Sequence, residues 1–306
     1  MPSRLSARLQ LVAAAVLFST GGAAIKAVSF TGWQIASFRS GIAALALLLM
    51  MPGVRRGWTL RHDRGGPLRQ AQGRFWRVVL VGVAYAGGLT LFVLANRLTT
   101  AANTIFLQST APLYLLFLAP WLLKEPIRRQ DLGFMLAVGL GLMLFFVGTE
   151  QPAATAPDPV RGNLLALGSG LFWALAVCGL RWLAARPERG SPVAAVVSGN
   201  ITAFLIALPM ALPVGTHPWA NWVVIVYLGV VQIALAYVLV TAALRVLPAL
   251  EASVILLLEP VLNPVWAWVV QRETPGVWAL LGGAIILGAT TLKSWMEGRR
   301  VAAPVT

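Results

Sequence analysis

Charged residues are scarce in this chain, and their scarcity excludes a protein whose surface faces water on all sides. Only 11% of the 306 residues are charged, whereas 58% are hydrophobic. A soluble domain carries roughly 25% charged residues. The mean hydropathy of +0.78 points the same way. The composition therefore predicts a polytopic membrane protein.

Cysteine and histidine are almost absent, which excludes several kinds of site. Cys178 is the single cysteine and lies in an apolar run, so we expect no intramolecular disulfide and a thiol that packs as a small hydrophobic group. His62 and His217 are the two histidines, and both lie in polar connections, so no metal site is expected. The phosphate-binding pattern GxxxxGK[ST] is also missing, and no cofactor is predicted.

The net charge of +14 does not predict nucleic-acid binding. The Lys and Arg residues gather in no single motif; they cluster between apolar runs, which is typical of membrane proteins with basic cytoplasmic connections. With the N-terminus in the cytoplasm, most of the 24 Lys and Arg residues fall on the cytoplasmic side. We therefore expect a bacterial-type inner membrane protein with both termini in the cytoplasm. The first run is similar to a signal peptide, but it continues past the small residues that would mark cleavage.

Ten apolar runs are long enough to cross a bilayer, since a membrane helix needs roughly 20 such residues. They cover residues 9–29, 33–51, 76–96, 101–123, 132–149, 162–184, 192–213, 219–243, 250–271 and 276–293. The connection 52–75 is basic and rich in Gly and Pro. The Pro- and Ala-rich linker 150–161 divides the chain near its middle.

The two halves of the chain resemble each other. A shift of 148 residues superimposes Pro112 on Pro260, Arg97 on Arg245 and Lys124-Glu125 on Arg272-Glu273. Near the start of each half, a shift of 155 residues superimposes Phe18 on Trp173 and Lys26 on Arg181. Matching charges and prolines at one offset favour a true repeat over a chance likeness between two apolar segments.

Each repeat contains five spans, and because five is odd the second repeat enters the membrane from the opposite side. We therefore expect an all-α membrane protein with ten transmembrane helices, arranged as two inverted-topology five-helix repeats. The predicted boundaries are 1–149 and 162–293 for the repeats, 150–161 for the linker and 294–306 for a cytoplasmic tail. In transporters such repeats place the substrate site where the halves meet, and they permit alternating access.

Residues 227–275, YLGVVQIALAYVLVTAALRVLPALEASVILLLEPVLNPVWAWVVQRETP, resemble the second repeat of the EamA family, part of the drug/metabolite transporter superfamily. The first repeat is similar to the family in FSTGGAAIK (18–26), FRSGIAALALLL (38–49) and TAPLYLLFLAPWLLKE (110–125). The resemblance covers nearly the whole chain. Two features depart from it: Phe18-Ser19 stands where the family often has Trp-Gly, and the connection 52–75 is longer.

The resemblance implies a secondary transporter that works without ATP or a cofactor. Members export amino acids, some of them aromatic, as well as related metabolites or toxic compounds. We expect export of a small metabolite, an amino acid in the first place. The alternative within transport is a multidrug or nucleotide-sugar carrier of the same superfamily. The expected partners are a small-molecule substrate and the lipid bilayer, and no nucleic acid.

Two other classes of function fit less well. An intramembrane enzyme would need a catalytic set, but no span contains histidine, and Ser19 and Lys26 lie about two helical turns apart. A passive channel would use rings of like groups in an oligomer. Here the pseudo-symmetry lies within one chain, which is compatible with a monomer. The sequence therefore does not predict an enzyme.

Polar side chains within the spans are expected to face the protein interior, because lipid contact is costly for them. The candidates for the substrate site are Thr20, Arg39, Tyr85, Thr104, Gln108, Trp173, Gln232 and Tyr237. Amide and hydroxyl groups beside aromatic walls suit a small amphipathic solute. A lone Ser or Thr often bonds a backbone carbonyl instead, whereas the amides of Gln108 and Gln232 need several partners and are stronger candidates.

Several other residues have a simpler interpretation. Trp219, Trp222 and Tyr227 lie near span ends, as is typical of the interfacial aromatic belt. Lys26 and Arg181, which the repeat matches, are expected to extend to the two membrane surfaces. Arg39 could bind a carboxylate or pair with backbone carbonyls, and the sequence favours neither.

Glu259 lies in the middle of the apolar run 249–270, next to Pro260. Pro260 and its repeat mate Pro112 each remove a backbone donor, and this loosens their helices at equivalent places, as the flexible points of a transporter require. Glu259 is either a proton-coupling site or a structural and conformational group. Its repeat mate is Ala111, so the symmetry does not decide between them.

Overall fold

A bundle of α-helices makes up the protein, whose structure is a computed structural model. It describes residues 4–51, 68–122, 129–147, 152–244, 246–247 and 249–302. Within these ranges no strand occurs, and a single β-bridge joins Ala153 and Ala156 in the linker.

The helices of the first half are α1 (Arg4–Ser19), α2 (Gly21–Lys26), α3 (Gly32–Met50), α5 (Leu68–Leu98), α6 (Ala101–Gln108), α7 (Ala111–Leu122) and α8 (Arg129–Val147). Those of the second half are α9 (Pro159–Ala184), the short 3-10 helix η1 (Pro187–Arg189), α10 (Pro192–Ala211), α11 (Trp219–Tyr227), the π-helix η2 (Leu228–Leu235), α12 (Ala236–Ala243), α13 (Ala249–Leu256), α14 (Leu258–Gln271) and α15 (Val277–Ala302).

These helices form ten apolar segments. Eight of them are long and apolar enough to cross a membrane, and two shorter ones, Asp131–Phe146 and Val277–Lys293, complete the set. In chain order, spans 1 to 10 are α1–α2, α3, α5, α6–α7, α8, α9, α10, α11–α12, α13–α14 and α15. The expected fold class is therefore confirmed. Large apolar side chains such as Leu80, Leu136 and Val277 are exposed, as a lipid-facing surface requires.

The observed helices follow the expected runs, with three differences. The first span begins at Arg4 and is interrupted at Thr20. The third begins at Leu68, inside the segment that we expected to be a connection. The tenth continues to Ala302, through most of the expected cytoplasmic tail.

Hydroxyl side chains set where several of the helices begin. At the start of α3, the Thr31 side chain accepts a hydrogen bond from Gln34 N, and Gln34 Oε1 accepts one from Thr31 N. At α6 and α10 the cap has one bond only, which the Thr100 side chain accepts from Asn103 N and the Ser191 side chain accepts from Ala194 N. These caps satisfy amide groups that a helix cannot bond internally, so short polar connections suffice between long apolar spans.

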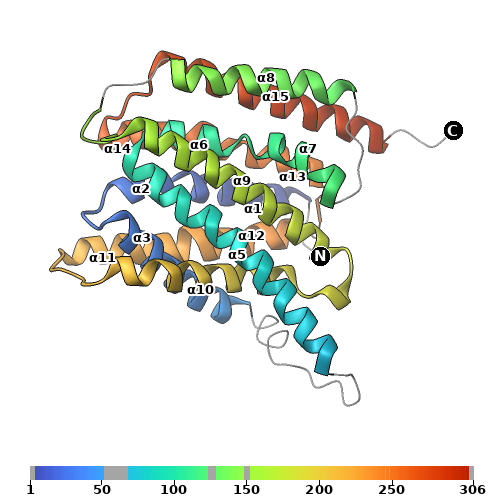
Figure 1. The fold of residues 1–306 in the computed structure, drawn as a ribbon, viewed down its shortest axis with the longest axis horizontal. Helices are drawn as coiled ribbons and strands as arrows, with labels where there is room; N and C mark the ends of the chain where they lie inside the picture. The colour runs from blue at the N-terminus through green and yellow to red at the C-terminus, as the bar shows by residue number, and fades with distance from the viewer. Residues whose placement is uncertain are drawn as a thin grey trace.

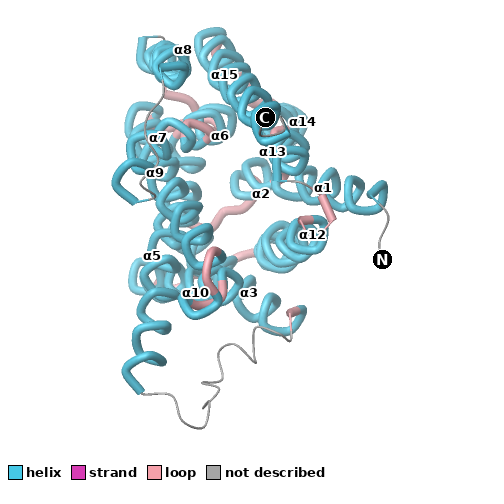
Figure 2. The backbone as a smooth tube through the Cα atoms, turned by 90° about the vertical axis from the view of Figure 1, so that its right-hand side faces the viewer, coloured by secondary structure: helices cyan, strands magenta, loops and turns pink. Residues whose placement is uncertain are grey.

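The first span of each half packs against the third and fourth spans of the other half. Thus α9 packs on α5, α6 and α7, and α1 packs on α12, α13 and α14. The second spans, α3 and α10, pack on each other, as do the fifth spans, α8 and α15. Figure 1 shows α8 and α15 along one edge of the bundle, and the turned view in Figure 2 places them at the same edge. Two inverted repeats produce this reciprocal arrangement.

An even number of spans brings both chain ends to one face of the bundle. Figure 1 shows both termini at the right, and we call this face the terminal end. The opposite face holds Lys26, the connections 99–100 and 272–276, and linker residues 152–158, and we call it the linker end.

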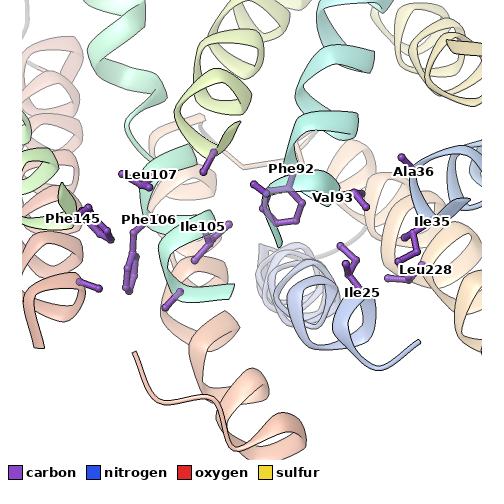
Figure 3. Close-up of a cluster of buried hydrophobic side chains, with 14 of the residues drawn as sticks. Ile25, Ile35, Ala36, Phe92, Val93, Ile105, Phe106, Leu107, Phe145 and Leu228 are labelled. Carbon is purple, nitrogen blue, oxygen red and sulfur yellow. The ribbon is translucent and has the colours of Figure 1, made fainter. Parts of the chain in front are cut away.

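The largest cluster of buried apolar side chains joins the two halves. Ile25, Phe92, Ile105 and Leu228 belong to it and come from four different spans (Figure 3). At the terminal end two separate clusters occur instead. One consists of Ala7, Leu11, Ala243, Leu247 and Ala252, and the other of Val78, Val81, Leu183, Ala194 and Ala195. The first lies on spans 1, 8 and 9, and the second on spans 3, 6 and 7.

The expectation that Lys26 extends to a membrane surface is wrong. Its side chain is 4% exposed and forms an ion pair with Glu273, at 2.8 Å between Nζ and Oε2. Arg181, its repeat mate, is exposed as expected. A buried ammonium group needs such a partner, because a charge left unpaired in the interior is costly.

Candidate functional site

Two spans are interrupted at equivalent points of the repeat. In span 4, α6 gives way to α7 at Ser109, and in span 9, α13 gives way to α14 at Leu257. These residues lie 148 positions apart and have similar backbone angles: φ −66° and ψ −3° for Ser109, φ −64° and ψ −9° for Leu257. Each lies three residues before a proline, Pro112 or Pro260, which has no amide hydrogen and crowds the preceding turn. One shared sequence feature thus produces two matching kinks.

Span 1 is interrupted without a proline, at Thr20 between α1 and α2. Three side chains of the second half bond to it: Tyr227 through its hydroxyl to Thr20 Oγ1 (2.8 Å), Trp266 through Nε1 to Ser19 Oγ (2.9 Å), and Gln232 through Nε2 to Phe18 O (3.3 Å). Tyr227, expected in the interfacial belt, is therefore partly turned inward. The matching region of span 6 lies within the continuous helix α9, so this interruption belongs to one half only.

Gln232 lies in the π-helix η2, whose wider turns are rare and often occur at functional sites. Its side chain is buried, and Oε1 has no hydrogen-bond partner among the described residues. The corresponding span of the first half, α5, is α-helical throughout. The expected candidates Thr20 and Gln232 thus meet where span 1 is broken and span 8 is widened.

Four aromatic rings from four spans meet in the interior, and we call them the ring cluster: Phe18, Tyr85, Trp173 and Tyr237. Phe18 meets Tyr237 with ring centroids 6.1 Å apart, and Tyr85 meets Trp173 at 5.9 Å. Both contacts join the first span of one half to the third span of the other half. Tyr85 and Tyr237 then meet edge to face at 6.0 Å, across the boundary between the repeats. Tyr85 is buried, and the other three rings are half-buried.

Arg39 is a fully buried cation beside this ring cluster. Its side chain lies in α3, is 1% exposed and interacts electrostatically with Tyr85. Nη2 donates to Leu89 O at 3.1 Å, whereas Nε has no hydrogen-bond partner among the described residues. No acidic side chain in the described part of the chain forms an ion pair with it. A buried charge without a partner is costly, so this site favours an anion.

Gln108 and Thr104 lie apart from the ring cluster. Gln108 Nε2 donates to Ser169 Oγ at 2.7 Å, and Ser169 Oγ donates to Gly88 O at 3.0 Å, so this chain of bonds joins spans 4, 6 and 3. Thr104 is fully buried, and its hydroxyl donates to Thr100 O at 3.0 Å within its own helix. Both side chains therefore take part in helix packing.

Glu259 lies at the start of α14, directly after the kink in span 9. It is half-buried and interacts electrostatically with Tyr237 of the ring cluster. The helices that pack on α13 and α14 carry cations that are paired with other acids: Arg8 with Glu251, Lys26 with Glu273, and Lys293 with Asp131. Within the described residues, Glu259 therefore forms no ion pair, and it interacts electrostatically with a tyrosine instead.

Buried asparagines are the main feature that the set of expected site residues left out. Asn96, Asn103, Asn200 and Asn263 are at most 3% exposed, and each has an Oδ1 without a hydrogen-bond partner in the described part of the chain. The Oδ1 atoms of Asn96 and Asn263 occupy space beside Gly22 that a Cβ atom would fill. The signal was available, because an amide inside an apolar run needs partners whether it belongs to Gln or to Asn.

Comparisons with known proteins agree with this architecture. The model of the EamA-like transporter family matches residues 5–147 and 160–295, and each match contains five of the ten spans. A solved structure described as "Crystal structure of protein" is 20% identical, with a TM-score of 0.58, and the alignment covers 98% of this chain and 100% of that one. At that identity the likeness shows the fold alone. A comparison with curated proteins finds no significant match. The resemblance inferred from the sequence motifs is therefore confirmed.

Proposed function

Because the chain belongs to the EamA-like transporter family, we propose that it exports amino acids, aromatic ones included, by alternating access. The chain is a multi-pass membrane transporter of the drug/metabolite transporter superfamily. The ring cluster is the observation that carries the proposal. Its contacts cross between the repeats, so any motion of one half against the other changes the space between these rings.

In this proposal Arg39 binds the substrate carboxylate. Its buried guanidinium has an unused donor, Nε, and lies next to Tyr85. A charge-assisted bond to a carboxylate would compensate the cost of burying the cation. The ring cluster then accepts the apolar part of the substrate, through contacts that suit aromatic side chains. Gln232 Oε1, also without a partner among the described residues, is a candidate acceptor for a substrate amine.

Glu259 is the proposed coupling group, with the kinks at Pro112 and Pro260 as the flexible points. A carboxylate that lies between a kinked helix and the ring cluster can respond both to protonation and to substrate. Tyr237 connects the two, because it interacts with Glu259 and packs against Phe18 and Tyr85. In this proposal the coupling group and the substrate contacts therefore belong to one connected set of side chains.

The proposed orientation puts the terminal end in the cytoplasm of a bacterial-type inner membrane. When ten spans alternate along the sequence, most Lys and Arg residues fall on that side, as the bias of cytoplasmic segments requires. Export then means that substrate enters the bundle at the terminal end and leaves at the linker end. A reporter fused after residue 306 tests the orientation, and activity restricted to the cytoplasm is the expected result.

The substrate proposal is tested by uptake of a labelled amino-acid panel into proteoliposomes, with and without an imposed pH gradient. We expect saturable uptake of at least one amino acid, with a loss of about tenfold or more in Arg39→Gln. Arg161→Gln, which removes an exposed arginine, is the matched control and should transport normally. Uptake that needs the gradient and loses this dependence in Glu259→Gln supports coupling at Glu259. Wild-type uptake by Arg39→Gln would contradict the carboxylate site, and failure of every amino acid would contradict the substrate class.

A further inference from the structure

One ion pair ties together four separate segments at the linker end. Lys26 Nζ and Glu273 Oε2 lie 2.8 Å apart, with side chains only 4% and 2% exposed. Glu273 Oε1 accepts a hydrogen bond from Ala101 N at 2.5 Å. Lys26 also donates to Thr99 O at 2.8 Å and to Thr155 O. The pair thus joins the end of span 1, the connection between spans 3 and 4, the linker, and the connection between spans 9 and 10.

The backbone next to Glu273 is shaped for this contact. Arg272 ends α14 with φ 56° and ψ 27°, a left-handed conformation that residues other than glycine adopt rarely. It is the one such non-glycine residue in the described part of the chain. The turn sends Glu273 back toward the bundle, and Glu273 N approaches Ala267 O at 3.4 Å. An unfavourable conformation of this kind persists where the surrounding contacts require it.

The terminal end is held together by different contacts. It has two ion pairs between the halves in the described residues. Arg8 with Glu251 has side chains that are 52% and 29% exposed, and Lys293 with Asp131, at 16% and 8%, joins the fifth spans α15 and α8. Its two buried apolar clusters are separate, one on spans 1, 8 and 9 and the other on spans 3, 6 and 7. In the described residues, therefore, the buried ion pair at the linker end also bonds to the connection after span 3 and to the linker before span 6, whereas the ion pairs at the terminal end join spans 1 and 9 or the two fifth spans.

The repeat permits the two ends to be compared at equivalent positions. Lys26 and Arg181 occupy equivalent positions, and Glu273 matches Glu125, which lies outside the described residues. Lys26 is buried and paired, whereas Arg181 is exposed. The described residues thus show this contact at one of the two equivalent cations and not at the other. Alternating access produces such a difference, because the two ends differ at any moment of the transport cycle.

We propose that the Lys26–Glu273 ion pair is the latch of a gate at the linker end, closed in this structure and broken once in each transport cycle. The proposal rests on alternating access and on no particular substrate. Opening separates Glu273 from both Lys26 and Ala101 N, so the linker and two connections are released together. Substrate leaves at this end only while the latch is open.

The test measures access to a buried linker-end position in nanodiscs, where reagents reach both faces. Cys178 is first replaced by serine, and Ala102→Cys, on a fully buried residue of α6, is the reporter. Glu273→Gln keeps the size of the side chain but removes its charge. It is expected to raise the rate of labelling by a membrane-impermeant maleimide about tenfold or more, because Lys26 loses its buried partner. Glu251→Gln, which breaks the exposed pair at the other end, is the matched control and should leave the rate unchanged.

Glu273→Asp is the second variant, in case Glu273→Gln does not fold. It keeps the charge but is one methylene shorter, so it cannot reach both Lys26 and Ala101 N, and a smaller rise in labelling is expected. Labelling rates equal to wild type in every folded variant at position 273 would overturn the latch. No substrate is needed for this readout, so failure of the amino-acid proposal and failure of the latch are separate results.

Discussion

The linker end and the terminal end of this bundle are built from equivalent parts of a repeat, yet they are held together differently. At the linker end, side chains that are 4% and 2% exposed carry opposite charges and join four segments. At the terminal end, the described contacts between the halves include apolar clusters, the ion pair of half-exposed Arg8, and the Lys293–Asp131 pair between the fifth spans. A sequence repeat therefore does not imply equal contacts at any one time.

The difference teaches which contacts can act as a switch. A buried ion pair with good geometry is a strong contact. Removing one of its partners costs much free energy, because the other charge then stays buried alone. An exposed pair contributes little and its loss is hardly felt. Apolar clusters are non-directional, so they permit the two groups of spans to slide. A transporter that alternates between two states needs both kinds of contact.

The largest effect is expected at the Lys26–Glu273 pair, where a single and a double substitution should have opposite results. Lys26→Met leaves Glu273 buried without a partner and should destabilise the closed linker end by about 3–5 kcal/mol. Lys26→Met with Glu273→Leu replaces the pair by apolar contacts and should restore the thermal stability, because such replacements are often neutral or stabilising. The double variant should then remain closed, with slow labelling of Ala102→Cys. A double variant as open as the single one would contradict this expectation, because it would show that apolar contacts do not replace the ion pair.

The kinks come next in expected magnitude. Pro260→Ala restores a backbone donor in the first turn of α14, in the middle of span 9, and permits α13 and α14 to join as one straight helix. We expect higher thermal stability, together with a transport rate about tenfold lower, because the span no longer bends. Pro112→Ala is the matched variant at the equivalent point and should behave similarly. The idea of paired hinges fails if only one of these variants is affected.

A smaller effect is expected where span 1 is interrupted. Tyr227→Phe removes the 2.8 Å bond to Thr20 and should lower the free energy of unfolding by about 1 kcal/mol. Trp219→Phe, at a side chain that is 78% exposed, is the control. Chemical denaturation in detergent measures both. Equal stability of Tyr227→Phe and wild type would mean that Tyr227 belongs to the interfacial belt after all.

The smallest effect is expected at the exposed ion pair of the terminal end. Arg8→Gln should change stability by about 0.2–1 kcal/mol, the usual range for surface pairs, and the change should vanish in high salt. The labelling of Ala102→Cys should stay at the wild-type rate. A large rise in labelling would place a second latch at this end and would remove the contrast between the two ends.

The sequence predicted most of the fold and part of the site, and the reason is physical. Apolar runs set the ten spans, because lipid demands them over a fixed length, and the prolines marked the matching kinks in spans 4 and 9. The break at Thr20 was not predictable, since its partners Tyr227 and Trp266 lie in the other half of the chain.

The latch was not predictable either, because its two residues are also far apart in the sequence. Lys26 was expected at a surface because its own neighbours are apolar, and its partner Glu273 lies 247 residues away. The π-helix around Gln232 has no local signal either, since its residues are typical of any apolar helix. The repeat did indicate that Lys26 and Arg181 occupy equivalent positions. The structure adds that their contacts differ.

The most direct test of the account measures distances at both ends of one molecule. Spin labels on Arg161 and Thr274 report the linker end, and labels on Glu188 and Leu244 report the terminal end, all at exposed positions on a Cys178→Ser background. Double electron–electron resonance in nanodiscs should show longer linker-end distances and shorter terminal-end distances in Glu273→Gln than with Glu273 intact. Distances that stay unchanged, or that lengthen at both ends together, would contradict alternating access controlled by this ion pair.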